Sequence, residues 1–187
     1  MKQFLALIVV CLSFLSGYAQ DLAAQEHEAA VILAQIRSSK EDSETDAAHL
    51  AFKKAMSNLV KSKGFFDYTF KELKIADLRS ADQTVRLLTW NIEYSDLSYS
   101  YGGFVLRREE GRDKVLIQEL NDQLDAYNTK PEGVIDAKSW YGAIYFKIID
   151  FSFQGKTCYL LFGYDAGTTM SNFKILDVLS FSGQTAK

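Results

Sequence analysis

Cysteine is scarce in this 187-residue chain, which contains only Cys11 and Cys158. Cys11 lies inside an apolar N-terminal run, apart from the segments that read as folded elements. A lone Cys158 cannot form an internal disulfide there, so we expect a hydrophobic core to supply the stability. Cys158 alternates with Leu160 and Phe162 in a predicted strand. This pattern favours a small buried side chain over a reactive thiol.

Histidine is equally rare, and both His27 and His49 lie in predicted helices. The stretch QEHEAA resembles a zinc-protease helix but lacks the second histidine four residues on. Glu26, His27 and Glu28 are adjacent, so their side chains point in different directions and we expect a solvated helical surface. Zinc needs three or four converging ligands. The sequence therefore predicts no metal site.

Catalytic and nucleotide-binding motifs are also missing from the sequence. There is no G-x-S-x-G nucleophile motif and no glycine-rich phosphate-binding loop. We therefore predict no cofactor and assign no catalytic residue.

Basic residues are not in excess: 21 Lys and Arg stand against 24 Asp and Glu, a formal net charge of −3. Nucleic-acid binding draws on clustered lysine and arginine, so we expect no nucleic-acid partner. Hydrophobic residues make up 48% of the chain, which is typical of a globular protein. The length is that of one domain with a sizeable core.

Long hydrophobic runs are confined to the N-terminus. Residues 4–15 are apolar but too few to span a bilayer, and they follow Lys2. Gly17, Tyr18 and Ala19 then fit a small-x-small cleavage site. We predict a signal peptide over residues 1–19 and export to the periplasm, the cell surface or the medium, with no stable membrane span once it is removed.

Helical patterns follow the predicted signal peptide. Residues 21–38 are rich in alanine, and polar residues up to Asp46 then lead into a second helix. In this helix Phe52, Met56 and Val60 belong to an apolar stripe with helical spacing. Gly64 is a predicted C-terminal cap. We assign residues 20–64 to a helical N-terminal segment.

The pattern changes from helix to strand after Gly64. Phe66, Tyr68 and Phe70 alternate with polar residues, which predicts a half-buried strand. About six further strands follow with hairpin-length links, so residues 65–187 read as an antiparallel β domain. The predicted fold class is α+β, with N-terminal helices followed by a mainly antiparallel β-meander. An open sheet, a sandwich and a partial barrel all remain compatible with this pattern.

The stretch WYGAIYFKIIDFSFQGKTCYLLFGYD, residues 140–165, is rich in aromatic residues. Gln154-Gly155 predicts a two-residue turn that joins two strands into a hairpin. We interpret this hairpin chiefly as core, because strands favour aromatic cross-strand pairs.

Aromatic residues outside those strands form the best case for a binding site. Tyrosines interleaved with serines and an aspartate surround the loop NIEYSDLSYSYGG. Exposed rings on a rigid sheet stack on sugars or cover an apolar partner. We predict that the binding residues are Trp90, Glu93, Tyr94, Asp96, Tyr99, Tyr101 and Trp140.

Paired carboxylates offer an alternative to simple binding. Glu93 and Asp96 follow Trp90 at a strand end, and a glycosidase needs two carboxylates across a cleft with aromatic rings beside the sugar. Nothing in the sequence gives the two carboxylates different environments, which acid–base chemistry requires.

Three stretches resemble one family. They are FDYTFKELKIADLRSADQTVRLLTWN, SWYGAIYFKII and LLFGYDAGTTMSNFKILDVLSF. Their order and spacing, over about residues 50–181, are similar to those of an uncharacterised family of exported Bacteroidota proteins. The resemblance implies export across the inner membrane of a Gram-negative cell and transfers no catalytic residue. Members of that family continue past the last strand, which implies further strands beyond those of this chain.

These observations together lead to one functional hypothesis and one alternative. We expect an exported, non-catalytic binding or structural module whose partner is an envelope protein or a glycan. The alternative is a hydrolase of glycans or cell-envelope polymers that uses Glu93 and Asp96.

Overall fold

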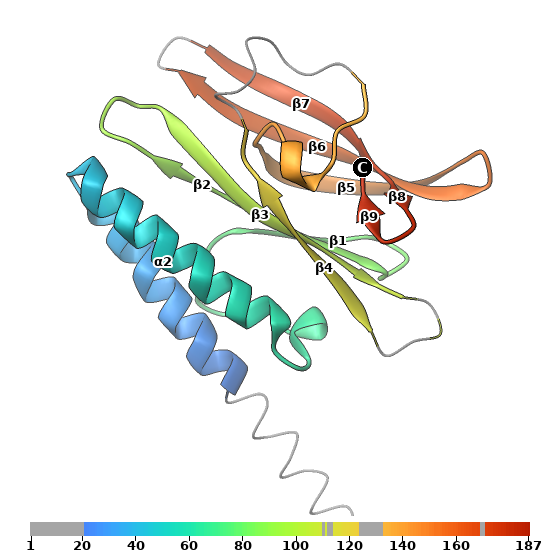
Figure 1. Ribbon diagram of the computed structural model, residues 1–187, viewed down its shortest axis with the longest axis horizontal. Coiled ribbons are helices and arrows are strands. Elements are labelled where there is room, and N and C mark those ends of the chain that lie inside the picture. The colour runs from blue at the N-terminus through green and yellow to red at the C-terminus, as the bar shows by residue number, and fades with distance from the viewer. Residues whose placement is uncertain (1–20, 110, 112–113, 124–132, 169–170) are drawn as a thin grey trace, which may run out of the picture. The chain divides into compact units, whose positions relative to one another are not determined.

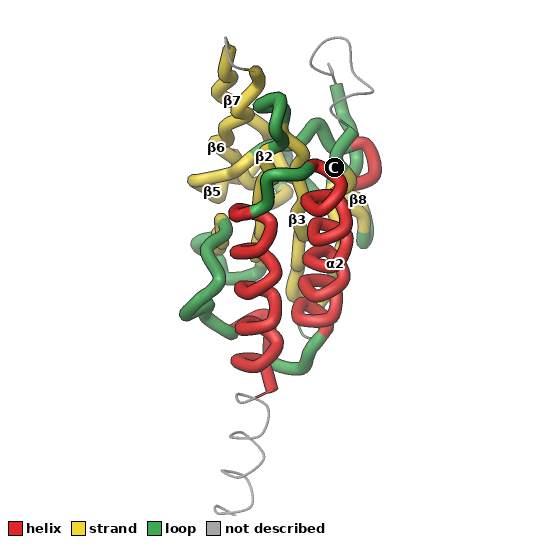
Figure 2. The backbone as a smooth tube through the Cα atoms, turned by 90° about the vertical axis from the view of Figure 1, so that its left-hand side faces the viewer, coloured by secondary structure: helices red, strands yellow, loops and turns green. Residues whose placement is uncertain are grey.

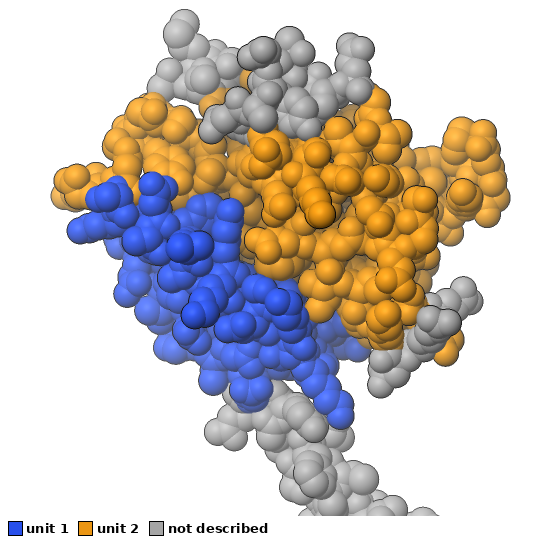
Figure 3. Space-filling model, viewed as in Figure 1, with its two compact units in different colours: residues 1–39, 43–74 blue, residues 40–42, 75–187 orange. Residues whose placement is uncertain are grey.

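The computed structural model describes residues 21–109, 111, 114–123, 133–168 and 171–187. The predicted signal peptide, residues 1–19, lies outside them. The chain divides into two compact units (Figure 3). The described part of the first unit is 21–39 and 43–74, and that of the second is 40–42, 75–109, 111, 114–123, 133–168 and 171–187.

Two helices lie side by side in the first unit (Figure 2). They are the helix over residues 21–38 and α2, Asp42–Lys61. The predicted apolar stripe of α2 is buried, which confirms the helical spacing read from the sequence. The buried apolar residues of the unit are Leu22, Ala29, Leu33, Ile36, Phe52, Met56, Leu59, Val60, Phe65, Phe66 and Leu73.

The segment after α2 is not the strand that we predicted from its alternating aromatic residues. Phe65–Asp67 is a short 3-10 helix, η1, and the chain is irregular from Tyr68 to Ile75. The phenyl rings of Phe65 and Phe66 are both buried. Successive residues of a strand point to opposite faces of the sheet, so a half-buried strand would leave one of the two rings exposed. The first unit therefore continues to Lys74.

A buried carboxylate determines the path of this segment. Oε1 of Glu26 accepts hydrogen bonds from the backbone amides of Lys71, Glu72 and Leu73 at 2.6, 2.6 and 2.9 Å. Oε2 accepts one from the Tyr68 hydroxyl at 2.7 Å. Burial raises the pKa of Glu26, but these hydrogen bonds outweigh it and hold the pKa below its usual value. Our prediction of a solvated surface is therefore wrong at Glu26.

The second histidine, His49, is buried on α2. Burial lowers its pKa, the charge of Lys53 lowers it further, and the charge of Asp46 partly opposes both, so that the resulting pKa is about 4. The folded protein therefore keeps His49 neutral between pH 6.5 and 4, while the unfolded chain binds a proton there. Stability contributed by neutral His49 is lost as the pH falls through this range.

We expect the free energy of unfolding of the His49→Leu variant to depend less on pH than that of the wild type. The free energy of unfolding should differ between pH 7 and pH 4 by about 3 kcal/mol less in this variant than in the wild type. This value follows from the lowering of the His49 pKa from 6.5 to about 4. Urea denaturation at a series of pH values measures it. His27→Gln, which changes an exposed histidine of the neighbouring helix, is the matched control. Equal pH dependence in the wild type and in His49→Leu would contradict the prediction.

The second unit contains antiparallel sheets (Figure 1). The first sheet has the order β1-β2-β3-β4, from β1 (Ala76–Arg79), β2 (Val85–Glu93), β3 (Tyr99–Arg108) and β4 (Val115–Asn121). The second has the order β5-β6-β7, from β5 (Ile144–Phe153), β6 (Lys156–Thr168) and β7 (Ser171–Leu179). A 3-10 helix, η3 (Ala137–Ser139), precedes β5, and β8 (Phe181–Ser182) pairs with β9 (Thr185–Ala186).

The two larger sheets of the second unit share one core. Val85, Leu87 and Val105 of the first sheet cluster with Tyr145, Leu161 and other residues of the second. The fold is α+β, as predicted, and the described strands form open sheets that pack face to face. The predicted β5–β6 hairpin is confirmed, and Gln154 and Gly155 both have positive φ at its turn, as a tight two-residue hairpin requires. Cys158 is buried, as predicted.

Among the described residues, no helix is both long enough and apolar enough to cross a membrane.

Candidate functional site

Two of the predicted binding residues, Trp90 and Tyr101, are buried in the first sheet, so our expectation that their rings form an exposed stacking surface is wrong. Trp90 lies directly opposite Gly102 on β3. A Cβ atom at Gly102 would come within 2.4 Å of the indole ring, so the missing side chain leaves the space that the ring fills. Trp90 is thus a cross-strand packing residue.

Tyr101 is fixed by buried hydrogen bonds. Its hydroxyl donates to Oδ1 of Asp165 at 2.8 Å and accepts from the backbone amide of Ala166 at 2.9 Å. Burial raises the pKa of Tyr101, and the hydrogen bond to Asp165 raises it further. The hydroxyl therefore stays protonated and joins β3 to β6.

The remaining residues of the predicted loop lie nearer the surface. Glu93 and Asp96 are exposed, while Tyr94 and Tyr99 are half-buried. Oδ1 of Asp96 accepts from the backbone amide of Ser98 at 2.9 Å, and hydrogen bonds from Ser98 lower the pKa of Asp96. Asp96 therefore stabilises its own turn, as aspartates commonly do.

A mainly apolar cavity of about 510 Å³ is lined by residues of the two larger sheets and is the candidate site for an apolar molecule. Leu87, Val105 and Leu120 of the first sheet line one wall. The second sheet and its flanking segments supply Trp140, Tyr141, Tyr145, Leu161, Leu176, Val178, Leu179 and Ala186. The volume is in the range of small-molecule sites, which are mostly apolar with a few polar groups. We call it the inter-sheet cavity.

A chain of hydrogen bonds crosses the wall of the inter-sheet cavity. Nε1 of Trp140 donates to the Tyr145 hydroxyl at 3.1 Å, and that hydroxyl donates to Oδ2 of Asp177 at 2.5 Å. Burial raises the pKa of Tyr145 well above its usual value, as do the charge and hydrogen bond of Asp177. Tyr145 therefore remains a donor, and Trp140 keeps a fixed orientation. Trp140 is buried, so its ring faces the cavity and not open solvent.

Charged groups of the lining residues are paired within the protein. Nζ of Lys187 lies 3.7 Å from Oδ2 of Asp136, and Oδ1 of Asp136 accepts from the backbone amide of Lys138. Asp177 accepts the hydrogen bond from Tyr145. These carboxylates therefore have structural partners, and among the described residues the lining includes no histidine, cysteine or glutamate. The described part of the lining is suited to holding an apolar molecule.

Comparison with known proteins adds no assignment: no protein family, no curated protein and no solved structure matches the chain. Among the described residues, no group of three or more His, Cys, Asp or Glu side chains is placed to hold a metal ion. The site therefore has to be interpreted from its own geometry.

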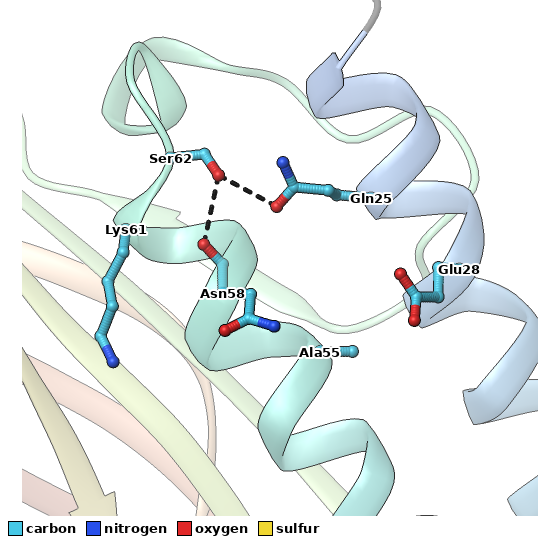
Figure 4. Close-up of a pocket in the computed structure, with 6 residues that line it drawn as sticks. All are labelled: Gln25, Glu28, Ala55, Asn58, Lys61 and Ser62. Carbon is cyan, nitrogen blue, oxygen red and sulfur yellow. Dashed lines mark hydrogen bonds between the residues drawn. The ribbon is translucent and has the colours of Figure 1, made fainter.

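A second, more polar groove lies between the two helices of the first unit (Figure 4). Its volume is about 400 Å³, and polar side chains such as Gln25, Glu28 and Asn58 line it. The Ser62 hydroxyl lies within hydrogen-bond distance of Oε1 of Gln25, at 2.9 Å, and of the Asn58 carbonyl, at 3.2 Å. The bond to Gln25 joins the end of α2 to the other helix, and the groove is open and polar, so we assign it a structural role.

Only one of the seven predicted binding residues, Trp140, lines the inter-sheet cavity. The others belong to the first sheet or its β2–β3 turn. The sequence carries one signal that bears on the cavity: aromatic residues at both ends of the stretch from Trp140 to Tyr145. Leu87, Val105 and Leu120 of the first sheet are separated from it by many residues, and no local pattern brings them together.

Proposed function

We propose that this protein is a non-catalytic binding module that holds a small, mainly apolar ligand in the inter-sheet cavity. The observation that carries the proposal is the cavity itself, with aliphatic and aromatic walls from both sheets and a hydrogen-bonded Trp140–Tyr145–Asp177 chain in one wall. Burial of apolar surface would drive binding, and the few polar groups would orient the ligand.

A glycan is a poorer candidate for this ligand than an apolar molecule. Sugar stacking needs exposed aromatic rings, and Trp90, Tyr101 and Trp140 are buried. Hydrolysis through Glu93 and Asp96 gains no support from the geometry either, because Asp96 is engaged by Ser98 in its own turn. A ligand with an aliphatic or aromatic body fits the lining better.

We further propose that the module acts outside the cytoplasm. The signal-peptide pattern over residues 1–19 supports this, as does the resemblance to exported Bacteroidota proteins. An exported domain with a single buried cysteine can bind its ligand without disulfide chemistry.

Filling the cavity with a larger side chain should weaken ligand binding. Ala186 is buried on β9 and lines the cavity, so Ala186→Phe places a ring in the ligand's volume. We expect the affinity for the apolar fluorescent probe N-phenyl-1-naphthylamine to fall at least tenfold, about the effect of losing one favourable side-chain contact. Probe fluorescence in a titration measures it.

The matched control is Thr185→Phe, which adds the same ring at the exposed neighbour on β9. This variant should bind the probe like the wild type. Equal affinity of all three proteins would show that the probe does not enter the cavity. Turnover of a polysaccharide that disappears in Glu93→Gln would instead favour the hydrolase.

A further inference from the structure

The outer face of the β5–β6–β7 sheet is apolar and exposed. In this sheet the core face holds Tyr145, Tyr159 and Leu161. On the opposite face Phe153, Leu176 and Val178 are 59%, 61% and 51% exposed. Contiguous exposed apolar surface on a soluble domain marks an interaction site.

Positive charge rims this face. Strand register places Lys147 opposite Phe162, Lys156 opposite Phe153 and Lys174 opposite Tyr164, all on the outer side of the sheet. Nζ of Lys147 lies 5.6 Å from the centre of the Phe162 ring, so its aliphatic stem runs along the apolar surface. We call this surface the lysine-rimmed face.

Negative charge is segregated to the other side of the same sheet. The described positions of β5, β6 and β7 on the lysine-rimmed face include no Asp or Glu, while Asp150, Asp165 and Asp177 lie on the core side by register. The chain as a whole is acidic, with a net charge of −3. An anionic surface would therefore attract this face and repel most others, which fixes the orientation of docking.

The turn of the β5–β6 hairpin extends this face away from the rest of the sheet (Figure 1). Its sequence from Phe151 to Thr157 is FSFQGKT, in which every residue is exposed and Lys156 carries the only charge. Asp150, just before it, accepts hydrogen bonds from the backbone amides of Ala81 and Asp82, both at 2.9 Å, which anchors the base of the hairpin. Two phenyl rings beside one lysine suit the boundary between headgroups and acyl chains.

The geometry points to an anionic phospholipid bilayer as the partner of the lysine-rimmed face. Phe151, Phe153 and their apolar neighbours enter the headgroup–acyl boundary, and the three lysines contact the lipid phosphates. A second copy of the chain is a poorer occupant, because packing two such faces together brings lysines against lysines. The contact is peripheral and independent of the ligand in the inter-sheet cavity.

The test is sedimentation of the full chain with vesicles of equal parts phosphatidylglycerol and phosphatidylcholine, compared with vesicles of phosphatidylcholine alone. The wild type should bind the anionic vesicles preferentially, and less as salt is raised. Phe151→Ser combined with Phe153→Ser should weaken binding at least tenfold. Lys147→Gln and Lys156→Gln should each weaken it about fivefold.

The matched control is Phe173→Ser. Phe173 is exposed on β7 but lies opposite Asp165, on the other side of the sheet, so this variant should bind like the wild type. All the proteins share residues 1–20, so differences among them report on the face alone. Circular dichroism checks that each variant is folded.

Three results would overturn the proposal. One is equal vesicle binding by the double phenylalanine variant and by Phe173→Ser. Another is a wild type that binds neither kind of vesicle, which would favour a protein partner. The third is a wild-type dimer in analytical ultracentrifugation that the double variant converts to monomer without any change in vesicle affinity, which would assign the face to a second copy.

Discussion

Asp77→Ala should lower the free energy of unfolding of the second unit by about 3–5 kcal/mol, the usual cost of breaking a buried ion pair. Arg86 on β2 is 0% exposed. Its Nε and Nη2 atoms donate to Oδ1 and Oδ2 of Asp77, both at 2.8 Å, in a bidentate pair between β1 and β2. Removing the carboxylate takes two charge-assisted hydrogen bonds away from a fully buried guanidinium, and the loss of these two bonds is the source of the expected cost.

Tryptophan fluorescence is the appropriate measurement, since Trp90 and Trp140 both lie in the second unit. Glu119→Ala, which removes an exposed carboxylate from β4 of the same sheet, should change the stability by less than about 0.5 kcal/mol. The double variant Asp77→Leu with Arg86→Met should recover much of the loss, because an apolar pair of similar size replaces both charges. A loss of stability below about 1 kcal/mol in Asp77→Ala would mean that the Asp77–Arg86 pair stabilises the unit no more than an exposed ion pair does.

The sequence predicted the arrangement of the elements well where the local pattern was strong. The stripe of Phe52 and Met56 identified α2, and the Gln154-Gly155 turn identified the β5–β6 hairpin. These features depend on residues within one or two turns of each other, so a period of 3.6 or 2 reveals them. The same reasoning gave the α+β class.

The outer face of the β5–β6 hairpin could not be predicted in the same way. The stretch from Ile144 to Phe153 is apolar at both alternating sets of positions, a pattern that also suits a strand buried on both sides. We expected any ligand face at the Trp140 end and in the Tyr94–Tyr101 loop. The structure instead leaves large apolar side chains exposed on the outer side of these strands, with Phe153 and Val178 open to solvent.

The inter-sheet cavity was beyond local prediction because its walls come from distant segments. Leu87 and Leu161 belong to different sheets, and only the packing of those sheets brings them together. The cavity and the lysine-rimmed face share β7, since Leu176 and Val178 contribute to the lining of one and to the surface of the other.

In the segment after α2, the buried carboxylate of Glu26 overrides a strand pattern. Phe66, Tyr68 and Phe70 alternate as in a strand, yet the backbone amides that follow them bind a carboxylate 45–47 residues earlier in the chain. A glutamate between Gln25 and His27 in a helix is normally solvated, and the sequence gives no sign of its distant partners. One weak sequence signal argues against a strand here. Phe65 and Phe66 are consecutive, whereas a half-buried strand places an apolar residue at every second position.

Glu26→Ala should accordingly lower the free energy of unfolding of the first unit by about 4 kcal/mol. Four hydrogen bonds to a buried carboxylate are lost, and bonds to charged groups contribute more than neutral ones. The amides of Lys71, Glu72 and Leu73 would be left without this acceptor, so the segment that closes over the helices should detach. Circular dichroism at the helical minimum, followed during urea denaturation, reports on this unit because both described α-helices lie in it, apart from Asp42, the first residue of α2.

Two further variants separate the charge of Glu26 from its position. Glu28→Ala, two residues on and exposed, should cost less than about 0.5 kcal/mol. Glu26→Gln keeps one acceptor oxygen but turns an amide group toward backbone donors, so its cost should fall between the other two. Because hydrogen bonds keep the pKa of Glu26 low, the carboxylate stabilises the fold above its unfolded pKa, and that contribution is lost as the pH falls through the folded value. The gap between wild type and Glu26→Gln should therefore narrow in acid, and a gap that is the same at every pH would show that the charge contributes nothing to this contact.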